Sequence, residues 1–229
     1  MFGSAERRRL LALLREHALL RGDFVLSSGQ SSSYYLDARR VTLMAEGSAL
    51  VGAAFLDALN TADADAVAGL TVGADPIITA VTVCAGQSGR KIDGLIVRKE
   101  AKRHGAGRRI EGPWRDGMRV AIVDDTSTTG ESSLSAARVV AEAGAHVLGV
   151  WQLIDREQGA REAVRQAGYS FHALYTAADI LSSEEKPASR SVALRERRGR
   201  SGATASLDFV LVAWHGEGHA IAKHRSRVR

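Results

Sequence analysis

The chain has 229 residues, of which 45% are apolar and 25% charged, with 31 Lys+Arg against 26 Asp+Glu and a formal net charge of +5. This composition favours a globular protein with a buried core and excludes wholesale disorder and a coiled-coil rod, and no apolar run reaches the roughly 18 residues of a membrane span. The single cysteine, Cys84, excludes an internal disulfide framework and favours a reducing, cytoplasmic compartment.

The positive charge is concentrated in two segments. Residues 183–229 hold ten basic and five acidic residues, so that residues 1–182 are neutral overall. Within that neutral body, residues 90–119 hold ten basic and four acidic residues. A basic chain often binds nucleic acid, but the neutrality of the body argues against a nucleic-acid partner here.

The N-terminal part carries the signals of a helix, a hairpin and a second helix. Apolar residues at positions 10, 11, 14 and 18 recur at helical spacing and predict an amphipathic first helix. Arg15 and Glu16 interrupt the apolar run, which argues against a targeting segment. Apolar runs at 24–26 and 34–36 flank a Ser/Gly-rich turn and predict two short strands, and residues 46–59 predict a helix.

From residue 66 onward, apolar runs alternate with helical segments. We expect strands at 66–70, 92–97, 119–123, 146–154 and 169–174, and a polar loop at 98–112. We expect helices at 130–143, 159–166 and 177–181. A further helix is expected to begin at Asp75-Pro76, with Asp75 as its N-cap. Strands that are buried on both faces appear as continuous apolar runs. The alternation therefore predicts an α/β fold with a doubly wound, mostly parallel central sheet flanked by helices and a ligand site at the carboxyl ends of the strands.

The segment from Arg119 to Ser132 carries the clearest chemical signal. A buried strand delivers Asp124 and Asp125 to its carboxyl end, and hydroxyl residues and Gly130 follow before a helix begins. The N–H groups at a helix start bind phosphate, whereas carboxylates accept hydrogen bonds from sugar hydroxyls or hold a divalent cation. A sugar phosphate meets both requirements. For the two carboxylates alone, a polar turn that caps a helix is the alternative interpretation.

A second segment, residues 97–107, carries clustered cations on a glycine-bearing loop. Arg98, Lys99, Lys102 and His104 could neutralise a leaving pyrophosphate, and the glycines would let the loop close over the site. A solvated surface loop is the alternative interpretation. Neither the Walker P-loop pattern nor a dinucleotide Gly-x-Gly-x-x-Gly pattern after a strand occurs, which argues against an ordinary NTPase and a dinucleotide-binding enzyme.

These segments together resemble a known family. The pattern at 119–132 resembles the diphosphoribosyl-binding signature of type I phosphoribosyltransferases. The string Arg-Lys-Glu-Ala-Lys-x-His-Gly from residue 98 resembles the flexible catalytic loop of orotate phosphoribosyltransferases, and residues 24–35 are similar to that family's small N-terminal hood. The resemblance covers roughly residues 5–182, with the three motifs in the expected order.

The resemblance implies an activity. The family transfers the 5-phosphoribosyl group from 5-phosphoribosyl 1-diphosphate (PRPP) to orotate, giving orotidine 5′-phosphate and pyrophosphate in pyrimidine (UMP) biosynthesis. It also implies Mg²⁺ that is carried by PRPP near Asp124 and Asp125 without a direct protein ligand. Finally, it implies a cytoplasmic homodimer, because the catalytic loop reaches into the active site of the neighbouring subunit.

The resemblance also assigns roles to single residues. Lys102, Lys99 and His104 would be catalytic, with Lys102 contributing most, and Thr128 and Arg156 would bind orotate. Tyr35 would pack against the pyrimidine or else be a core aromatic residue. The residues implied in PRPP binding are Arg98, Lys99, Lys102, His104, Asp124, Asp125, Thr126, Ser127, Thr128, Thr129, Gly130, Glu131 and Ser132.

The chain departs from the family at two positions and beyond one boundary. Ser27 and Gly73 stand where family members carry lysines, so two cationic contacts to pyrophosphate are missing. We expect a phosphoribosyltransferase domain at 1–182, with the hood formed largely by the N-terminal segment, and a basic, solvated extension at 183–229. Histidines in the extension lack a supporting cysteine and do not predict a zinc site.

Two alternative functions stay open. One is a phosphoribosyltransferase for another base, which would not need an arginine such as Arg156 to bind a ring carboxylate. The other is a regulatory RNA-binding protein on the same fold, which would keep the two carboxylates and bind a transcript through a basic face.

Overall fold

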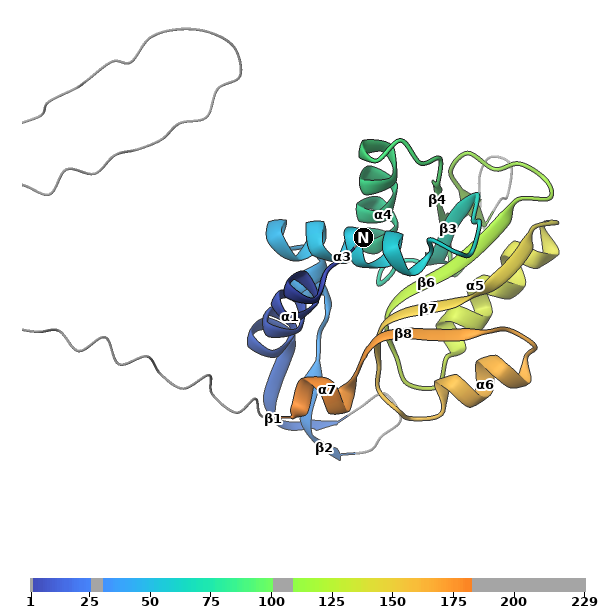
Figure 1. The fold of residues 1–229 in the computed structure, drawn as a ribbon. Helices are drawn as coiled ribbons and strands as arrows, with labels where there is room; N and C mark the ends of the chain where they lie inside the picture. Colours follow the sequence, from blue (N-terminus) through green and yellow to red (C-terminus); the bar gives the residue numbers. More distant parts are fainter. Residues whose placement is uncertain (1, 26–30, 101–108, 183–229) are drawn as a thin grey trace, which may run out of the picture. The chain divides into compact units, whose positions relative to one another are not determined.

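The computed structural model describes residues 2–25, 31–100 and 109–182 (Figure 1). It contains a six-stranded sheet and a separate two-stranded antiparallel sheet. The strands are β1 (Leu19–Val25), β2 (Ser31–Leu36), β3 (Ala66–Leu70), β4 (Asp93–Val97), β5 (Ile110–Glu111), β6 (Arg119–Ser127), β7 (His146–Asp155) and β8 (Phe171–Thr176). The helices are α1 (Ser4–Leu13), the π-helical turn η1 (Leu14–Ala18), α2 (Arg39–Thr42), α3 (Ala45–Ala58), α4 (Asp75–Gln87), α5 (Glu131–Glu142), α6 (Ala160–Gln166) and α7 (Ala177–Leu181).

The order of strands in the large sheet is β5-β4-β3-β6-β7-β8, and only the pairing of β4 with β5 is antiparallel. After β3 the chain continues to β4 on one side, and it later returns to β6 on the other side of β3. The strand order therefore changes direction between β3 and β6. In open α/β sheets, ligands bind in the crevice at the carboxyl ends of the strands at such a point.

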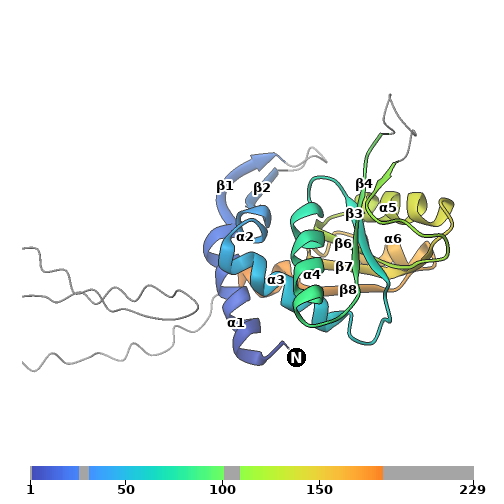
Figure 2. The ribbon, with the colours of Figure 1, turned by 90° about the horizontal axis from the view of Figure 1, so that it is seen from above.

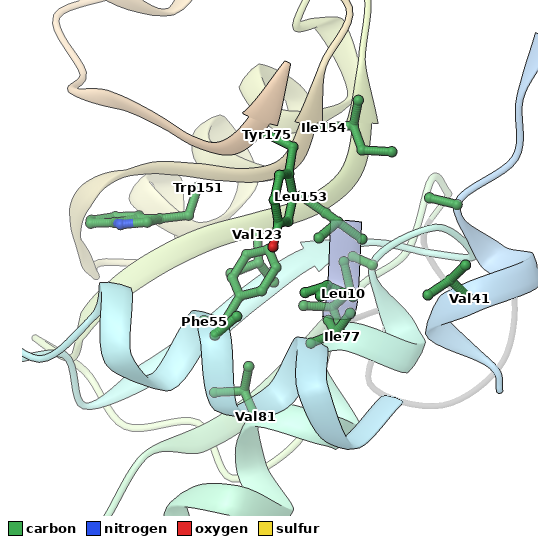
Figure 3. Close-up of a cluster of buried hydrophobic side chains, with 14 of the residues drawn as sticks. Leu10, Val41, Phe55, Ile77, Val81, Val123, Trp151, Leu153, Ile154 and Tyr175 are labelled. Atoms are coloured by element: carbon green, nitrogen blue, oxygen red, sulfur yellow. The ribbon is translucent and has the colours of Figure 1, made fainter. Parts of the chain in front are cut away.

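Helices cover both faces of the sheet, with α3 and α4 on one side and α5 and α6 on the other (Figure 2). Alternate residues of β6 belong to the two cores. Val120 and Ile122 pack in the cluster of α5 and α6, whereas Ala121 and Val123 pack in the cluster of α1, α3 and α4 (Figure 3). Burial on both faces explains the continuous apolar runs in the sequence, since each strand side chain finds an apolar partner.

The N-terminal segment forms the small sheet and is also tied to the last strand of the large one. Strands β1 and β2 pair antiparallel from Leu19 opposite Leu36 to the turn, and they form the hood. On α1, the Arg7 Nη2 donates a hydrogen bond of 2.9 Å to the Leu174 carbonyl oxygen. The Tyr175 hydroxyl donates one of 2.8 Å to the Arg7 carbonyl oxygen. These contacts fix the start of the chain against β8.

The predicted α/β fold with a mostly parallel sheet and an N-terminal hood is confirmed. The predicted strand at 66–70 and helix at 177–181 coincide with β3 and α7. The prediction of Asp75 as an N-cap is wrong: Ala74 is the N-cap, and Asp75 is the first residue of α4. The Asp75 carboxylate instead accepts a hydrogen bond of 2.7 Å from the Thr71 hydroxyl, so it fixes the preceding loop.

Several further boundaries differ from the sequence prediction. The hairpin strands expected at 24–26 and 34–36 are longer, as β1 and β2, and the strand expected at 169–174 is β8, which lies two residues further along the chain. The apolar positions at 10, 11, 14 and 18 do lie on a helical segment, but its last turn is the π-helical η1. The segment 98–112 was expected to be loop throughout, yet it contains β5, whose two residues pair with β4. The expected boundary at residue 182 and the extension at 183–229 lie at the edge of, or outside, the described residues. No helix in the described part of the chain has both the length and the apolar character needed to cross a membrane.

Candidate active site

A cleft of about 1230 Å³ opens at the carboxyl ends of β3 and β6, where the strand order changes direction. Six residues predicted for the site line it: Arg98, Lys99, Asp124, Asp125, Thr126 and Ser132. The hood contributes Tyr35 of β2 to the same cleft, and the chain just after the hood contributes Asp37 and Arg39. The cleft thus combines two carboxylates at its floor with cations from two different parts of the chain.

Asp124 and Asp125 lie at the end of β6, and Asp124 is only 6% exposed. The Asp125 N–H donates a hydrogen bond of 3.0 Å to Asp124 Oδ1, and the Thr126 N–H donates one of 2.7 Å to Asp125 Oδ1. Burial, together with the charge of Asp125, raises the pKa of Asp124 to about 7. Burial also raises the pKa of Asp125, against hydrogen bonds from Thr126 and the charge of Arg39. A ligand that donates hydrogen bonds from hydroxyl groups, or that carries positive charge, would stabilise the ionised form of the two carboxylates.

The loop after the carboxylates ends at the N-terminus of α5. Gly130 has a φ of +79° there, and a Cβ at this position would lie 3.3 Å from the Ala160 carbonyl oxygen, so that glycine suits both the turn and the close approach. No side chain at the N-cap position accepts a hydrogen bond from the first turn of α5. Its N–H groups are therefore free of a side-chain cap and suited to bind a phosphate.

Gly73 lies directly beside the two carboxylates, in the loop that follows β3. A Cβ at this position would lie 2.9 Å from Asp125 Oδ1 and 3.2 Å from Asp124 Oδ1. The absence of a side chain therefore leaves both carboxylates open to the cleft. The lysine that family members carry here is missing, and the second missing lysine, at Ser27, lies outside the described residues.

Arg39 is a cation of the cleft that the sequence did not predict. Its Nε lies 2.9 Å from Asp37 Oδ1, and this hydrogen bond together with the charge of Asp37 raises the pKa of Arg39. The positive charge of Arg39 partly offsets the rise in the pKa of Asp125 that burial causes. Arg39 therefore acts electrostatically on the floor of the cleft. The signal that could have found it is the polar Asp-Ala-Arg that follows the hairpin, because strand ends next to a binding cleft often carry functional side chains.

The base of the cationic loop is held by β4 and β5. The Arg98 N–H donates to the Arg109 carbonyl oxygen over 2.8 Å, and the Arg109 guanidinium donates to the carbonyl oxygens of Arg98 and Lys99. These contacts place Arg98 and Lys99 at the cleft. Lys102 and His104, predicted as catalytic, lie outside the described residues.

Arg156, predicted to bind orotate, follows the end of β7 and is 7% exposed. Its N–H donates to the Ser127 carbonyl oxygen over 3.0 Å, and its guanidinium carbon lies 5.6 Å from the centre of the Tyr34 ring in the hood. Nε and Nη2 are buried and have no hydrogen-bond partner among the described residues. Because an unpaired buried cation is costly, this guanidinium is suited to an anionic ligand.

The remaining predicted residues lie near the cleft but do not line it. Ser127, Thr128, Thr129, Gly130 and Glu131 connect the carboxylates to α5, and Arg156 lies beside this connection through its bond to Ser127. The Ser127 hydroxyl is buried and lacks a partner among the described residues. Within residues 2–25, 31–100 and 109–182, no group of three or more His, Cys, Asp and Glu side chains is arranged to hold a metal ion.

Comparisons with known proteins agree with this geometry. No family model matches the chain. The chain is 47% identical over 176 residues to the orotate phosphoribosyltransferase of Tropheryma whipplei, a match that spans 76% of this chain and 82% of that protein.

Solved structures show the same likeness. The orotate phosphoribosyltransferase of Mycobacterium tuberculosis H37Rv in complex with Fe(III) dicitrate has a TM-score of 0.71 and 41% identity, and the match covers 77% of this chain and 99% of that one. The Mycobacterium tuberculosis enzyme in complex with PRPP has a TM-score of 0.67 and 39% identity, with 76% and 98% covered.

Proposed function

The chain belongs to the orotate phosphoribosyltransferase family, and on that basis we propose that its cleft transfers the 5-phosphoribosyl group of PRPP to orotate. The products are orotidine 5′-phosphate and pyrophosphate, and the step serves pyrimidine biosynthesis. The observation that carries the proposal is the buried guanidinium of Arg156 beside the loop of Asp124 and Asp125, whose Nε and Nη2 have no hydrogen-bond partner among the described residues. A base with a ring carboxylate explains this cation, whereas an uncharged base would leave it unpaired.

The floor of the cleft suits the two polar parts of a phosphoribosyl group. Asp124 and Asp125 would accept hydrogen bonds from the ribose hydroxyls, which relieves two desolvated carboxylates. The 5-phosphate would bind along residues 126–132, at the uncapped N-terminus of α5, where N–H groups and hydroxyls donate to it.

The donor set at the floor also fits Mg²⁺ that arrives with the substrate. Two adjacent carboxylates with raised pKa values favour a nearby hard cation, but they supply fewer oxygens than Mg²⁺ takes. The two carboxylates would therefore lie near Mg²⁺ that is carried by PRPP and would not be its direct ligands. When bound, Mg²⁺ would neutralise part of the diphosphate charge.

The reaction is a substitution at the anomeric carbon of the ribose. The bond from this carbon to the pyrophosphate oxygen breaks with both electrons passing to the oxygen, and a ring nitrogen of orotate, which gives up its proton, forms the new bond. Positive charge develops on the sugar and negative charge on pyrophosphate. The protein's contribution is to hold both substrates and to stabilise the leaving group with fixed cations, so no covalent nucleophile is needed.

Cations of the loop that starts at residue 98 would neutralise the leaving group. Arg98 and Lys99 line the cleft at the base of their loop, and Lys102 and His104 of the same loop are proposed to complete the set. We propose a homodimer in which this loop serves the neighbouring subunit's cleft.

The test is release of pyrophosphate from PRPP in the presence of Mg²⁺ and one base at a time. We expect release with orotate and not with uracil or adenine. Lys102→Ala should lower turnover by a few orders of magnitude with an unchanged circular dichroism spectrum, since lost electrostatic stabilisation costs about 3 kcal/mol or more. Arg103→Ala, a charge change at the neighbouring position, is the matched control and should retain most turnover. Orotate-independent release, or full turnover in Lys102→Ala, would contradict the proposal.

A further inference from the structure

Gln152 is a fully buried polar side chain in the middle of β7, a strand that is otherwise apolar at its centre. Its Nε2 donates a hydrogen bond of 2.7 Å to the Ser133 hydroxyl oxygen, on the first turn of α5. Ser133 is itself only 1% exposed. Burying an amide and a hydroxyl in a sheet core is costly unless they are hydrogen-bonded, so this pair needs a structural or functional reason.

The pair leads directly to the floor of the cleft. Asp124 and Gln152 are register partners across β6 and β7, so their side chains extend toward the same face of the sheet. Ser133 lies between them on α5, and its hydroxyl donates a hydrogen bond of 3.3 Å to Asp124 Oδ2. The other oxygen, Oδ1, accepts the Asp125 N–H. Each oxygen of this carboxylate thus has one fixed donor.

The direction of the hydrogen bonds follows from the chemistry of the three groups. Above its raised pKa of about 7 the Asp124 carboxylate is ionised and only accepts, so there Ser133 gives its single hydroxyl hydrogen to Asp124. The Ser133 oxygen can then only accept from Gln152, so the amide nitrogen, and not the amide oxygen, must face it. In this orientation Gln152 Oε1 is buried and has no partner among the described residues. Gln152 therefore fixes the orientation of the Ser133 hydroxyl.

We propose that Gln152 and Ser133 are positioning residues that hold the Asp124 carboxylate with its remaining lone pairs toward the cleft, ready for the ribose hydroxyls of PRPP. The identity of this ligand rests on the proposed function, whereas the relay from Gln152 through Ser133 to Asp124 stands on the geometry alone. Because hydrogen bonds in a low-dielectric core strengthen one another, loss of either residue should loosen the carboxylate.

The first test compares the effect of each substitution on the KM for PRPP with its effect on the KM for orotate. Gln152→Leu should raise the KM for PRPP about fivefold to tenfold, the loss of one hydrogen bond, and change kcat and the KM for orotate by less than about twofold. Ser133→Ala should do the same. Gln152→Leu added to Ser133→Ala should have no further effect on the KM for PRPP, because the relay is already broken. Gln152→Glu should raise this KM more than Gln152→Leu, since its carboxylate would draw the Ser133 hydrogen away from Asp124.

Val150→Ala is the matched control, because Val150 is fully buried on the same strand and face but has no part in the relay. It should lower the melting temperature without changing the KM for PRPP. Independent additive effects of the two relay substitutions, or an unchanged KM in Gln152→Leu, would overturn the proposal.

A crystal structure of the ligand-free Gln152→Leu protein provides a readout that needs no activity. The Asp124 side chain should leave its wild-type rotamer or spread over two rotamers. An unchanged, well-ordered Asp124 would overturn the relay. If the wild-type protein shows no orotate-dependent turnover, the proposed function fails, and the Asp124 rotamer still decides the relay.

Discussion

Gly73 and Asp125 approach so closely that a Cβ at position 73 would lie 2.9 Å from the Asp125 Oδ1. The two residues belong to different strand ends, of β3 and β6, which meet where the strand order changes direction. Because the atom in the way is the end of a side chain, an added methyl group would displace the carboxylate rather than the backbone. The space above Asp125 is thus kept open by a residue without a side chain.

Gly73→Ala should therefore affect binding more than stability. We expect the KM for PRPP to rise about tenfold, as for the loss of one charged hydrogen bond, because Asp125 must rotate out of its position. The melting temperature should stay within about two degrees, since the loop is partly exposed. Steady-state kinetics and thermal unfolding check both values. An unchanged KM would show that the carboxylate need not stay in place.

Replacing Arg156 should separate stability from function. Arg156→Met removes a buried guanidinium without a hydrogen-bond partner among the described residues at Nε and Nη2, so the ligand-free protein should gain about 1–3 kcal/mol in its free energy of unfolding. The same variant should raise the KM for orotate by about thirtyfold or more, since a buried charge pair is lost, and leave the KM for PRPP unchanged.

Arg156→Lys is the control for charge alone. It keeps the cation but lacks the planar fork of donors, so it should lie between the wild type and Arg156→Met in the KM for orotate. An equal rise in the KM of both substrates would argue that Arg156 supports the fold of the cleft rather than the base.

The raised pKa of Asp124 makes stability depend on pH. The folded protein holds this proton up to about pH 7, whereas the unfolded chain loses it near the ordinary value of 3.8. Between these values the folded state binds more protons, so its stability falls as the pH rises. Asp124→Asn should stabilise the ligand-free protein by up to about 4 kcal/mol at about pH 8 and by less than half of that at about pH 5.

Urea unfolding of the wild type and of Asp124→Asn at the two pH values measures this difference. A gain that is equal at both pH values would mean that Asp124 titrates normally.

The proposed sharing of active sites between subunits predicts complementation. Lys102→Ala and Asp125→Asn proteins should each be nearly inactive, but in mixed dimers one site combines the intact loop of one chain with the intact carboxylates of the other. Random exchange of subunits should therefore restore about a quarter of the wild-type activity. Native mass spectrometry confirms that mixed dimers form, and their formation without restored activity would contradict a shared site.

The extension at 183–229 should have no catalytic part. A protein that ends at residue 182 should keep the wild-type kcat and both KM values, because every residue that we place in the site precedes this position. A loss of turnover in a protein that is still folded by circular dichroism would assign the extension a role in the reaction.

The fold and the floor of the site were predictable because they depend on local patterns. Apolar runs in the sequence located β3, β6 and β7. The carboxyl end of β6 was marked by Asp124 and Asp125, which follow its apolar run and precede a loop rich in hydroxyl residues. Arg156 was assigned through the family resemblance, and its position after an apolar strand agrees with this assignment.

The missed features depend on pairing across distance. Strand β5 is two residues long and forms only because β4 lies beside it. Gln152 interrupts an apolar run, and its hydrogen bond to Ser133, nineteen positions away, forms only when α5 packs on β7. The contact of Arg39 with Asp37 is local, but its place in the cleft depends on how the hood packs against the sheet.

In the described part of the chain, both edges of the six-stranded sheet carry features that disfavour pairing with a further strand. On one side β5 offers only two residues and carries Glu111, and on the other the Leu174 carbonyl of β8 already accepts a hydrogen bond from Arg7. Short, charged or covered edges of this kind prevent sheets from joining edge to edge. Arg7→Ala should therefore leave the Leu174 carbonyl of this edge without its donor and make the protein more prone to aggregate through β8.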